Sequence, residues 1–208
     1  FKKVLSVLGF EKETIGEYYS KIYSTCSVHV DFDNETLIYP EDKGLVVNDK
    51  TTSNFLHNEN FVVFECVCRM LDKGYRPEHI ELEPKWQLGR DAKSGKADIV
   101  VKDENGNALI IIECKTAGAE YNKEIKKTEE YGGQLFSYWQ QENATRWLAL
   151  YASDWKDGDI VVKSQVINCT DDANIVKMAE KDKDVLVYRN AHNDEERFKV
   201  WDETYNKA

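Results

Sequence analysis

Apolar and polar positions between Phe55 and Tyr75 repeat with the period of a helix. The apolar residues at 61, 64, 67, 68 and 71 form one stripe, and Gly74 follows it. The pattern predicts a helix that packs one face on a core and ends at the glycine. After Pro77 the spacing changes to alternation, so Ile80 to Leu88 is predicted to be a strand.

Two apolar runs, Ala97–Lys102 and Ala108–Cys114, flank the dipeptide Asn105-Gly106. Asn-Gly between apolar runs is the strongest short-range signal of a β-hairpin. Apolar residues point to both faces of the second run, which predicts a central strand covered by helices on both sides.

The remaining segments complete an α/β pattern. Residues 121–142 are expected to be helical, with a break at Gly132-Gly133, and Trp147 to Tyr151 forms a short strand. The order is therefore helix, three consecutive strands, helix, strand. We assign residues 54–152 to this core.

The flanks are expected to be additions to that core. In an N-terminal extension over 1–53, Phe1 to Leu8 and Ile15 to Tyr23 have helical spacing, and residues 28–32 and 37–40 predict a hairpin around Asp33-Asn34. Residues 153–208 read as a β-rich appendage with strands at 160–167, 185–188 and 197–201 and a helix near 173–181.

The hairpin turn fixes which residues face each other. With the turn centred between Asn105 and Gly106, a loop of two or four residues opposes residues whose numbers sum to 211, so Asp98 faces Glu113, whereas a three-residue loop shifts this register. Two carboxylates about 5 Å apart repel by roughly 3 kcal/mol at an effective dielectric near 20. A fold gains nothing from this arrangement unless a cation lies between them.

Lys115 lies on the same face as Glu113, two residues further on, and two interpretations stay open. The three side chains form either a solvated ion triad at a sheet end or a divalent metal site. In the second interpretation Asp98, Glu113 and the backbone carbonyl of Cys114 hold the metal, and Lys115 lies beside the attacked phosphate. Such oxygen ligands suit Mg²⁺, for which Mn²⁺ would substitute.

Composition limits the class of protein. The chain has 208 residues, 41% hydrophobic and 32% charged, with a net charge of −10. No apolar run approaches the ~18 residues of a membrane span, which predicts a soluble, cytoplasmic protein. The five scattered cysteines contain no CxxC pair, so we expect buried thiols and neither disulfides nor zinc. The chain begins at Phe1 and stops in a polar stretch, so we expect a fragment of a longer protein.

The average charge argues against a large nucleic-acid surface, but the lysines and arginines gather locally. Lysines and arginines cluster around the hairpin, at positions 85, 90, 93, 96, 115, 123, 126 and 127. Lys96, Lys123, Lys126 and Lys127 are candidates for contacts with a DNA backbone. The last three equally suit a solvated helix face.

An Asp, then a hairpin, then Glu-x-Lys resembles the PD-(D/E)xK nuclease superfamily, with Ala97 where that motif has proline. Gln134-Leu-Phe-Ser-Tyr138 matches a Q-x-x-x-Y motif, which places both side chains on one helix face. Together with N-F-V-V-F-E-C-V, these motifs resemble the N-terminal nuclease domain of type I restriction R subunits over about residues 55–152.

The resemblance implies a restriction-endonuclease-like mixed sheet flanked by helices, and Mg²⁺-dependent hydrolysis of double-stranded DNA. It implies catalytic roles for Asp98, Glu113, Lys115, Glu65, Gln134 and Tyr138. It also implies a translocase domain further along the same polypeptide, together with methyltransferase and specificity partners. The sequence has no GxxxxGK[ST] loop, so ATP would act only through those other parts.

Two other hypotheses stay open. The fold could serve as a protein-docking module with a vestigial site, or the chain could be a repair or junction nuclease of the same fold. Glu65 could also be no more than a helix-stabilising i,i+4 partner of Arg69.

Overall fold

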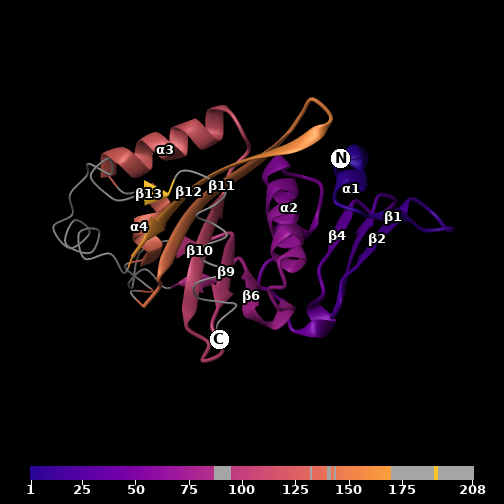
Figure 1. The fold of residues 1–208 in the computed structure, drawn as a ribbon, viewed down its shortest axis with the longest axis horizontal. Helices are drawn as coiled ribbons and strands as arrows, with labels where there is room; N and C mark the ends of the chain where they lie inside the picture. Colours follow the sequence, from indigo (N-terminus) through magenta and orange to yellow (C-terminus); the bar gives the residue numbers. More distant parts are fainter. Residues whose placement is uncertain (87–94, 132, 140–141, 143, 170–189, 192–208) are drawn as a thin grey trace.

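The computed structural model describes residues 1–86, 95–131, 133–139, 142, 144–169 and 190–191. The described elements form layers (Figure 1). Helices α3 (Ala119–Tyr131) and α4 (Gly133–Trp139) cover one face of a large mixed sheet. Helix α2 (Asn58–Asp72) covers the other face, and a small second sheet lies beyond α2. The architecture is α/β, as predicted.

The small sheet is formed by the N-terminal segment. Its antiparallel order is β1 (Glu11–Lys12), β2 (Tyr18–Ile22), β3 (Ser27–Asp31) and β4 (Thr36–Ile38). Strands β3 and β4 pair around Asp33-Asn34, which confirms the predicted hairpin. A short helix α1 (Lys2–Val7) precedes the sheet and confirms the first predicted helix.

The predicted helix at Ile15 to Tyr23 is wrong, because this segment contains β2, which pairs along its length with β3. Two adjacent tyrosines and an isoleucine suit a half-buried pleated surface, and the tertiary pairing outweighs the weak helical spacing.

Helix α2 follows two short 3₁₀ turns, η1 (Glu41–Lys43) and η2 (Lys50–Ser53). It ends two residues before Gly74, and its buried side chains include Phe64, Val67 and Leu71, which confirms the predicted stripe. The helix starts three residues after Phe55, with His57 as its N-cap.

The large sheet has the order β13-β12-β11-β10-β9-β6-β5. Its strands span Val46–Val47 (β5), Ile80–Leu82 (β6), Ile99–Lys102 (β9), Ala108–Cys114 (β10), Trp147–Lys156 (β11), Asp159–Asn168 (β12) and Asn190–Ala191 (β13). Strand β10 is the fourth of the seven, and all its residues are buried, as predicted for a central strand. It is antiparallel to β9 and parallel to β11.

The predicted strand at Ile80–Leu88 is shorter in the structure. After the 3₁₀ turn η3 (Pro77–His79), β6 ends at Leu82, and Glu83 takes a left-handed conformation with φ of +54°. The chain then forms a separate small pair, β7 (Lys85–Trp86) with β8 (Gly95–Lys96).

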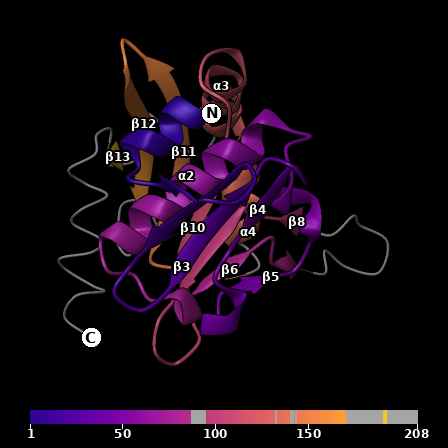
Figure 2. The same cartoon turned by 90° about the vertical axis from the view of Figure 1, so that its right-hand side faces the viewer.

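Strand β11 is twice as long as predicted. It continues from Tyr151 through Lys156 and pairs along its whole length with β12. Figure 2 shows this long hairpin projecting from the sheet beside α2 and α3. The β-structure expected at 160–167 is therefore part of the main sheet. Strand β11 continues past residue 152, where the core was predicted to end.

The helical segment after β10 is divided, as predicted, between α3 and α4. All five cysteines are buried and free, which confirms the expected thiols. Within the described residues every helix is too short or too polar to span a bilayer. The strands and helix expected at 173–181, 185–188 and 197–201, together with Arg90 and Lys93, lie outside the described residues.

Candidate active site

The register of the β9–β10 hairpin brings two carboxylates together. Ile112 pairs with Ile99 and Ile111 with Val100, so the predicted register holds at this end of the hairpin. A shift between Ala108 and Ile110 affects only the turn end. Asp98 directly precedes β9 and faces Glu113, and its Oδ2 accepts a hydrogen bond of 2.6 Å from the backbone N–H of Cys114.

Glu113 is a buried acid near the end of the central strand β10, with only 2% of its surface exposed. Its Oε1 accepts a hydrogen bond of 2.6 Å from the Lys115 ammonium group. Its Oε2 is buried and accepts no hydrogen bond from the described residues. The Tyr138 hydroxyl is near Glu113, but its single proton is donated to the backbone carbonyl of Lys96 at 2.6 Å. Among the described residues, the site therefore contains a buried carboxylate oxygen without a donor.

Burial raises the pKa of both acids and so disfavours their ionised forms. Burial, followed by the charge of Asp98, raises the pKa of Glu113 to about 8. Burial also raises the pKa of Asp98 to about 6, against the opposing attraction of Lys115. An added cation would favour the charged forms of both groups.

Lys115 lies between these acids and the first turn of α2. Its Nζ donates to the Cys114 carbonyl at 2.9 Å and lies 3.4 Å from Glu59 Oε2, in addition to its contact with Glu113. Burial opposes its charge, yet the neighbouring carboxylates of Glu113 and Asp98 outweigh burial and raise the pKa of Lys115. Lys115 therefore stays an ammonium ion.

Glu59 is a residue that the sequence analysis missed. It lies in the first turn of α2, and its charge raises the pKa values of both Asp98 and Glu113. A sequence signal existed, because the start of a helix that packs across a sheet lies near one end of the strands. Glu59 occupies that first turn, whereas Glu65 lies almost two turns further along the helix.

Glu65 is placed away from the two acids. It is 1% exposed, forms an ion pair with Arg69, and accepts a hydrogen bond of 2.6 Å from the Tyr151 hydroxyl. Tyr151 is opposite Cys114 in the sheet, and side chains alternate between faces, so Glu65 is on the α2 face and Glu113 on the α4 face.

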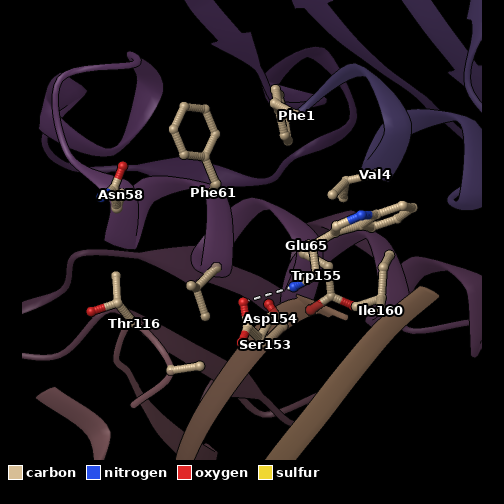
Figure 3. Close-up of a pocket in the computed structure, with 12 residues that line it drawn as sticks. Phe1, Val4, Asn58, Phe61, Glu65, Thr116, Ser153, Asp154, Trp155 and Ile160 are labelled. Carbon is tan, nitrogen blue, oxygen red and sulfur yellow. Dashed lines mark hydrogen bonds between the residues drawn. The ribbon is translucent and has the colours of Figure 1, made fainter. Parts of the chain in front are cut away.

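Glu65 lines a pocket of about 410 Å³. Figure 3 shows it there with Phe61, Trp155 and Asp154. The structure thus does not bring Glu65 together with Asp98, Glu113 and Lys115.

Gln134 and Tyr138 lie on one face of α4, as the motif predicts. The Gln134 side-chain amide donates to the Tyr138 hydroxyl at 3.2 Å. Gln134 is exposed and Tyr138 is buried, and burial together with the charges of Glu113 and Asp98 raises the pKa of Tyr138. Tyr138 therefore borders the two acids, and Gln134 lies at the rim.

The four candidate DNA-binding lysines differ in their surroundings. Lys96 forms ion pairs with Glu83 and Asp49, and Lys127 lies 2.8 Å from the buried Glu124. Lys123 is exposed, 4.0 Å from Glu120, and Lys126 is exposed on the same helix. Acids offset the charges of Lys96 and Lys127. Lys123 and Lys126 are therefore the better candidates for contact with a DNA backbone.

The oxygen atoms around Asp98 fit a hard divalent cation. Two carboxylates and the Cys114 carbonyl are adjacent, and no residue that the structure describes donates to the buried Glu113 Oε2. In the described part of the chain, no three His, Cys, Asp or Glu side chains cluster as metal ligands. A metal here would therefore use these two carboxylates, the carbonyl and water.

A mixed sheet with helices on both faces, and with acids and a lysine at the end of its central hairpin, is compatible with a nuclease-like α/β protein. Residues 65–149 match the family described as the type I restriction enzyme R protein N terminus (HSDR_N), so this segment is similar to an HsdR-like N-terminal domain. The match includes Asp98, Glu113, Lys115, Gln134 and Tyr138, whereas Glu59 precedes it. No curated protein matches the chain at a significant level.

Proposed function

We propose that this chain is the Mg²⁺-dependent DNA endonuclease domain of a type I-like restriction enzyme, with a PD-(D/E)xK active site. The observation that carries the proposal is the convergence of Asp98, Glu113 and Lys115 at one end of a rigid central hairpin. The family match of residues 65–149 supports the same class.

Asp98, Glu113 and the Cys114 carbonyl would hold Mg²⁺, for which Mn²⁺ would substitute. When bound, such an ion lowers the pKa of a coordinated water and offsets negative charge at the phosphate. Glu59 lies on the far side of Lys115, 3.4 Å from its Nζ, and adds negative charge near the site without being one of the proposed metal ligands.

Lys115 supplies the fixed positive charge of the site. Its side chain is 13% exposed and contacts three oxygen atoms, so its position is already fixed. Little reorganisation energy is therefore needed when a phosphate binds. It would stabilise charge on the phosphate or orient the attacking water. Tyr138 holds the Lys96 carbonyl, and the exposed Gln134 would contact the phosphate backbone.

These contacts are all directed to phosphate, which carries no base sequence. The domain would therefore cut double-stranded DNA without recognising a sequence itself. Recognition and ATP-driven movement would come from the specificity and methyltransferase partners and from a translocase domain of the parent polypeptide.

The test is cleavage of plasmid DNA by the parent enzyme carrying Asp98→Ala or Lys115→Ala. We expect cleavage to fall by at least about 100-fold, with ATPase activity and folding retained. Lys102→Ala serves as the matched control, since Lys102 is on the same hairpin but pairs with Glu81 at its other end. Cleavage at the wild-type rate by either site variant would contradict the proposal.

The rival docking-module hypothesis has one observation in its favour. Lys115 already neutralises Glu113 and contacts Cys114, so the charges are partly balanced without a metal. The two hypotheses differ in whether a divalent ion binds Glu113 Oε2, the oxygen that Lys115 does not contact.

A further inference from the structure

We propose that the ion pair between Glu83 and Lys96 is a positioning element that fixes the Asp98 carboxylate and links it to Tyr138. Its importance for cleavage rests on the proposed function, whereas its effect on Asp98 does not. Neither residue of the pair touches the reacting phosphate in this proposal.

Glu83 has an uncommon backbone conformation. It is 5% exposed, and its φ of +54° lies in the left-handed region that a residue with a side chain seldom adopts. In this conformation its backbone N–H donates to the Asp98 carbonyl at 3.0 Å. Strained backbone of this kind persists only where the surroundings enforce it.

The surroundings that enforce it centre on Lys96. Its Nζ pairs with the Glu83 carboxylate, lies 3.1 Å from Asp49 Oδ2, and donates to the Thr51 hydroxyl at 3.3 Å. The Thr51 hydroxyl is also 3.4 Å from each carboxylate oxygen of Glu83. The lysine charge is thus enclosed by two acids, which suits a structural role better than contact with DNA.

Lys96 connects the ion pair to the rest of the site. Its own carbonyl accepts the Tyr138 hydroxyl proton, and Asp98 is only two residues further along the chain. The segment 96–98 is therefore anchored at Lys96 by side chain and carbonyl, and at Asp98 by the Glu83 N–H. Because Asp98 lies outside the ladder of β9, these contacts replace strand pairing there.

The same strand pair provides a matched control. Glu81 and Lys102 form an ion pair between β6 and β9, two residues from Glu83 and at the opposite end of β9 from Asp98. Both pairs join the same two segments of chain, but only Glu83 binds the Asp98 backbone.

The experiment follows the backbone amide of Cys114 in the metal-free 208-residue chain by NMR hydrogen exchange. This amide donates to Asp98, whereas the next amide, that of Lys115, donates to the Tyr151 carbonyl at 2.8 Å. We expect Glu83→Gln and Lys96→Met each to accelerate exchange at Cys114 by about tenfold or more, with Lys115 little changed. Glu81→Gln should leave both amides unchanged, and Asp98→Asn calibrates the full effect.

Unaltered exchange at Cys114 in both pair variants would overturn the proposal, as would equal acceleration at Cys114 and Lys115. If Glu83→Gln does not fold, Glu83→Gly relieves the backbone strain while removing the carboxylate, and the same acceleration is expected. A subsequent Mn²⁺ titration separates the two proposals. Accelerated exchange at Cys114 with no Mn²⁺ binding by the wild type supports the positioning role and refutes the nuclease site.

Discussion

Glu113 shows how a single buried residue can be costly to the fold and still suit a function. Its carboxylate is buried at the end of the central strand, with one oxygen paired to Lys115 and the other without a donor among the described residues. Buried polar groups without partners destabilise a fold, so such a residue indicates a role beyond stability. Because burial raises the pKa of Glu113, this destabilisation can be measured as a pH dependence of the free energy of unfolding.

The first prediction concerns the pH dependence of stability without metal. The folded state raises the pKa of Glu113 from about 4.5 to about 8, so the folded chain binds this proton more tightly than the unfolded chain. The free energy of unfolding therefore falls as pH rises between these values. Glu113→Gln removes this titration, so the variant should match the wild type near pH 4.5 and exceed it at pH 8.

Thermal unfolding in EDTA measures the difference, at about 2–4 °C for each kcal/mol in a chain of this size. A gap in Tm that stays constant from pH 5 to pH 8 would show that Glu113 is not buried as described. Lys102→Met, an exposed change on the same hairpin, controls for general effects of charge.

The second residue-scale prediction separates the two acids of α2. Glu59→Gln should weaken Mn²⁺ binding and DNA cleavage several-fold, because Glu59 lies beside Lys115. Glu65→Gln should leave both unchanged and lower the free energy of unfolding by about 1–3 kcal/mol, since it disturbs the contacts with Arg69 and Tyr151. Calorimetric Mn²⁺ titrations and denaturant unfolding measure these effects, and the reverse pattern would restore Glu65 to the site.

At the scale of elements, the carboxylate pair was predictable because a hairpin is local. The Asn-Gly turn fixes the register, and the register places Asp98 opposite Glu113. The position of Glu59 in the first turn of α2 was a sequence signal, but its contact with Lys115 joins residues 56 positions apart and depends on how α2 crosses the sheet. The same reason explains why the partners of Lys96 could not be seen in the sequence.

Helix α4 depends on the glycine at its start. Gly133 has a φ of +53°, and a Cβ atom there would lie 2.9 Å from both Glu124 Oε1 and Thr128 Oγ1. Glu124 also accepts a hydrogen bond of 3.3 Å from the backbone N–H of Gln134. The buried acid and the glycine together set the direction in which Gln134 and Tyr138 point.

We therefore expect Gly133→Ala to lower the free energy of unfolding by about 1–3 kcal/mol and to reduce cleavage by displacing Gln134. Gly158→Ala is the matched control, because Gly158 has a φ of +91° with no atom within 4 Å of the added Cβ. Denaturant unfolding and plasmid cleavage report the two effects. Equal activity losses in both variants would argue against a steric effect at α4.

For the whole molecule, the sequence predicted the order of the layers better than the lengths of the strands that form them. The alternating helix and strand pattern was enough to expect a central strand covered on both faces. The extension of β11 through the polar residues Ser153, Asp154 and Lys156 was not predictable, because these residues are stabilised by pairing with β12. Likewise, β2 formed in place of a helix because β3 was available to pair with it.

The most direct test of the central claim is a crystal of this chain soaked in Mn²⁺, followed by an anomalous difference map. The account predicts a peak between the carboxylates of Asp98 and Glu113, beside the Cys114 carbonyl, with Glu113 Oε2 among the ligands. No peak at high Mn²⁺, with Lys115 still bridging Glu113 and Cys114, would contradict the account and favour a nuclease-like fold that serves as a docking module.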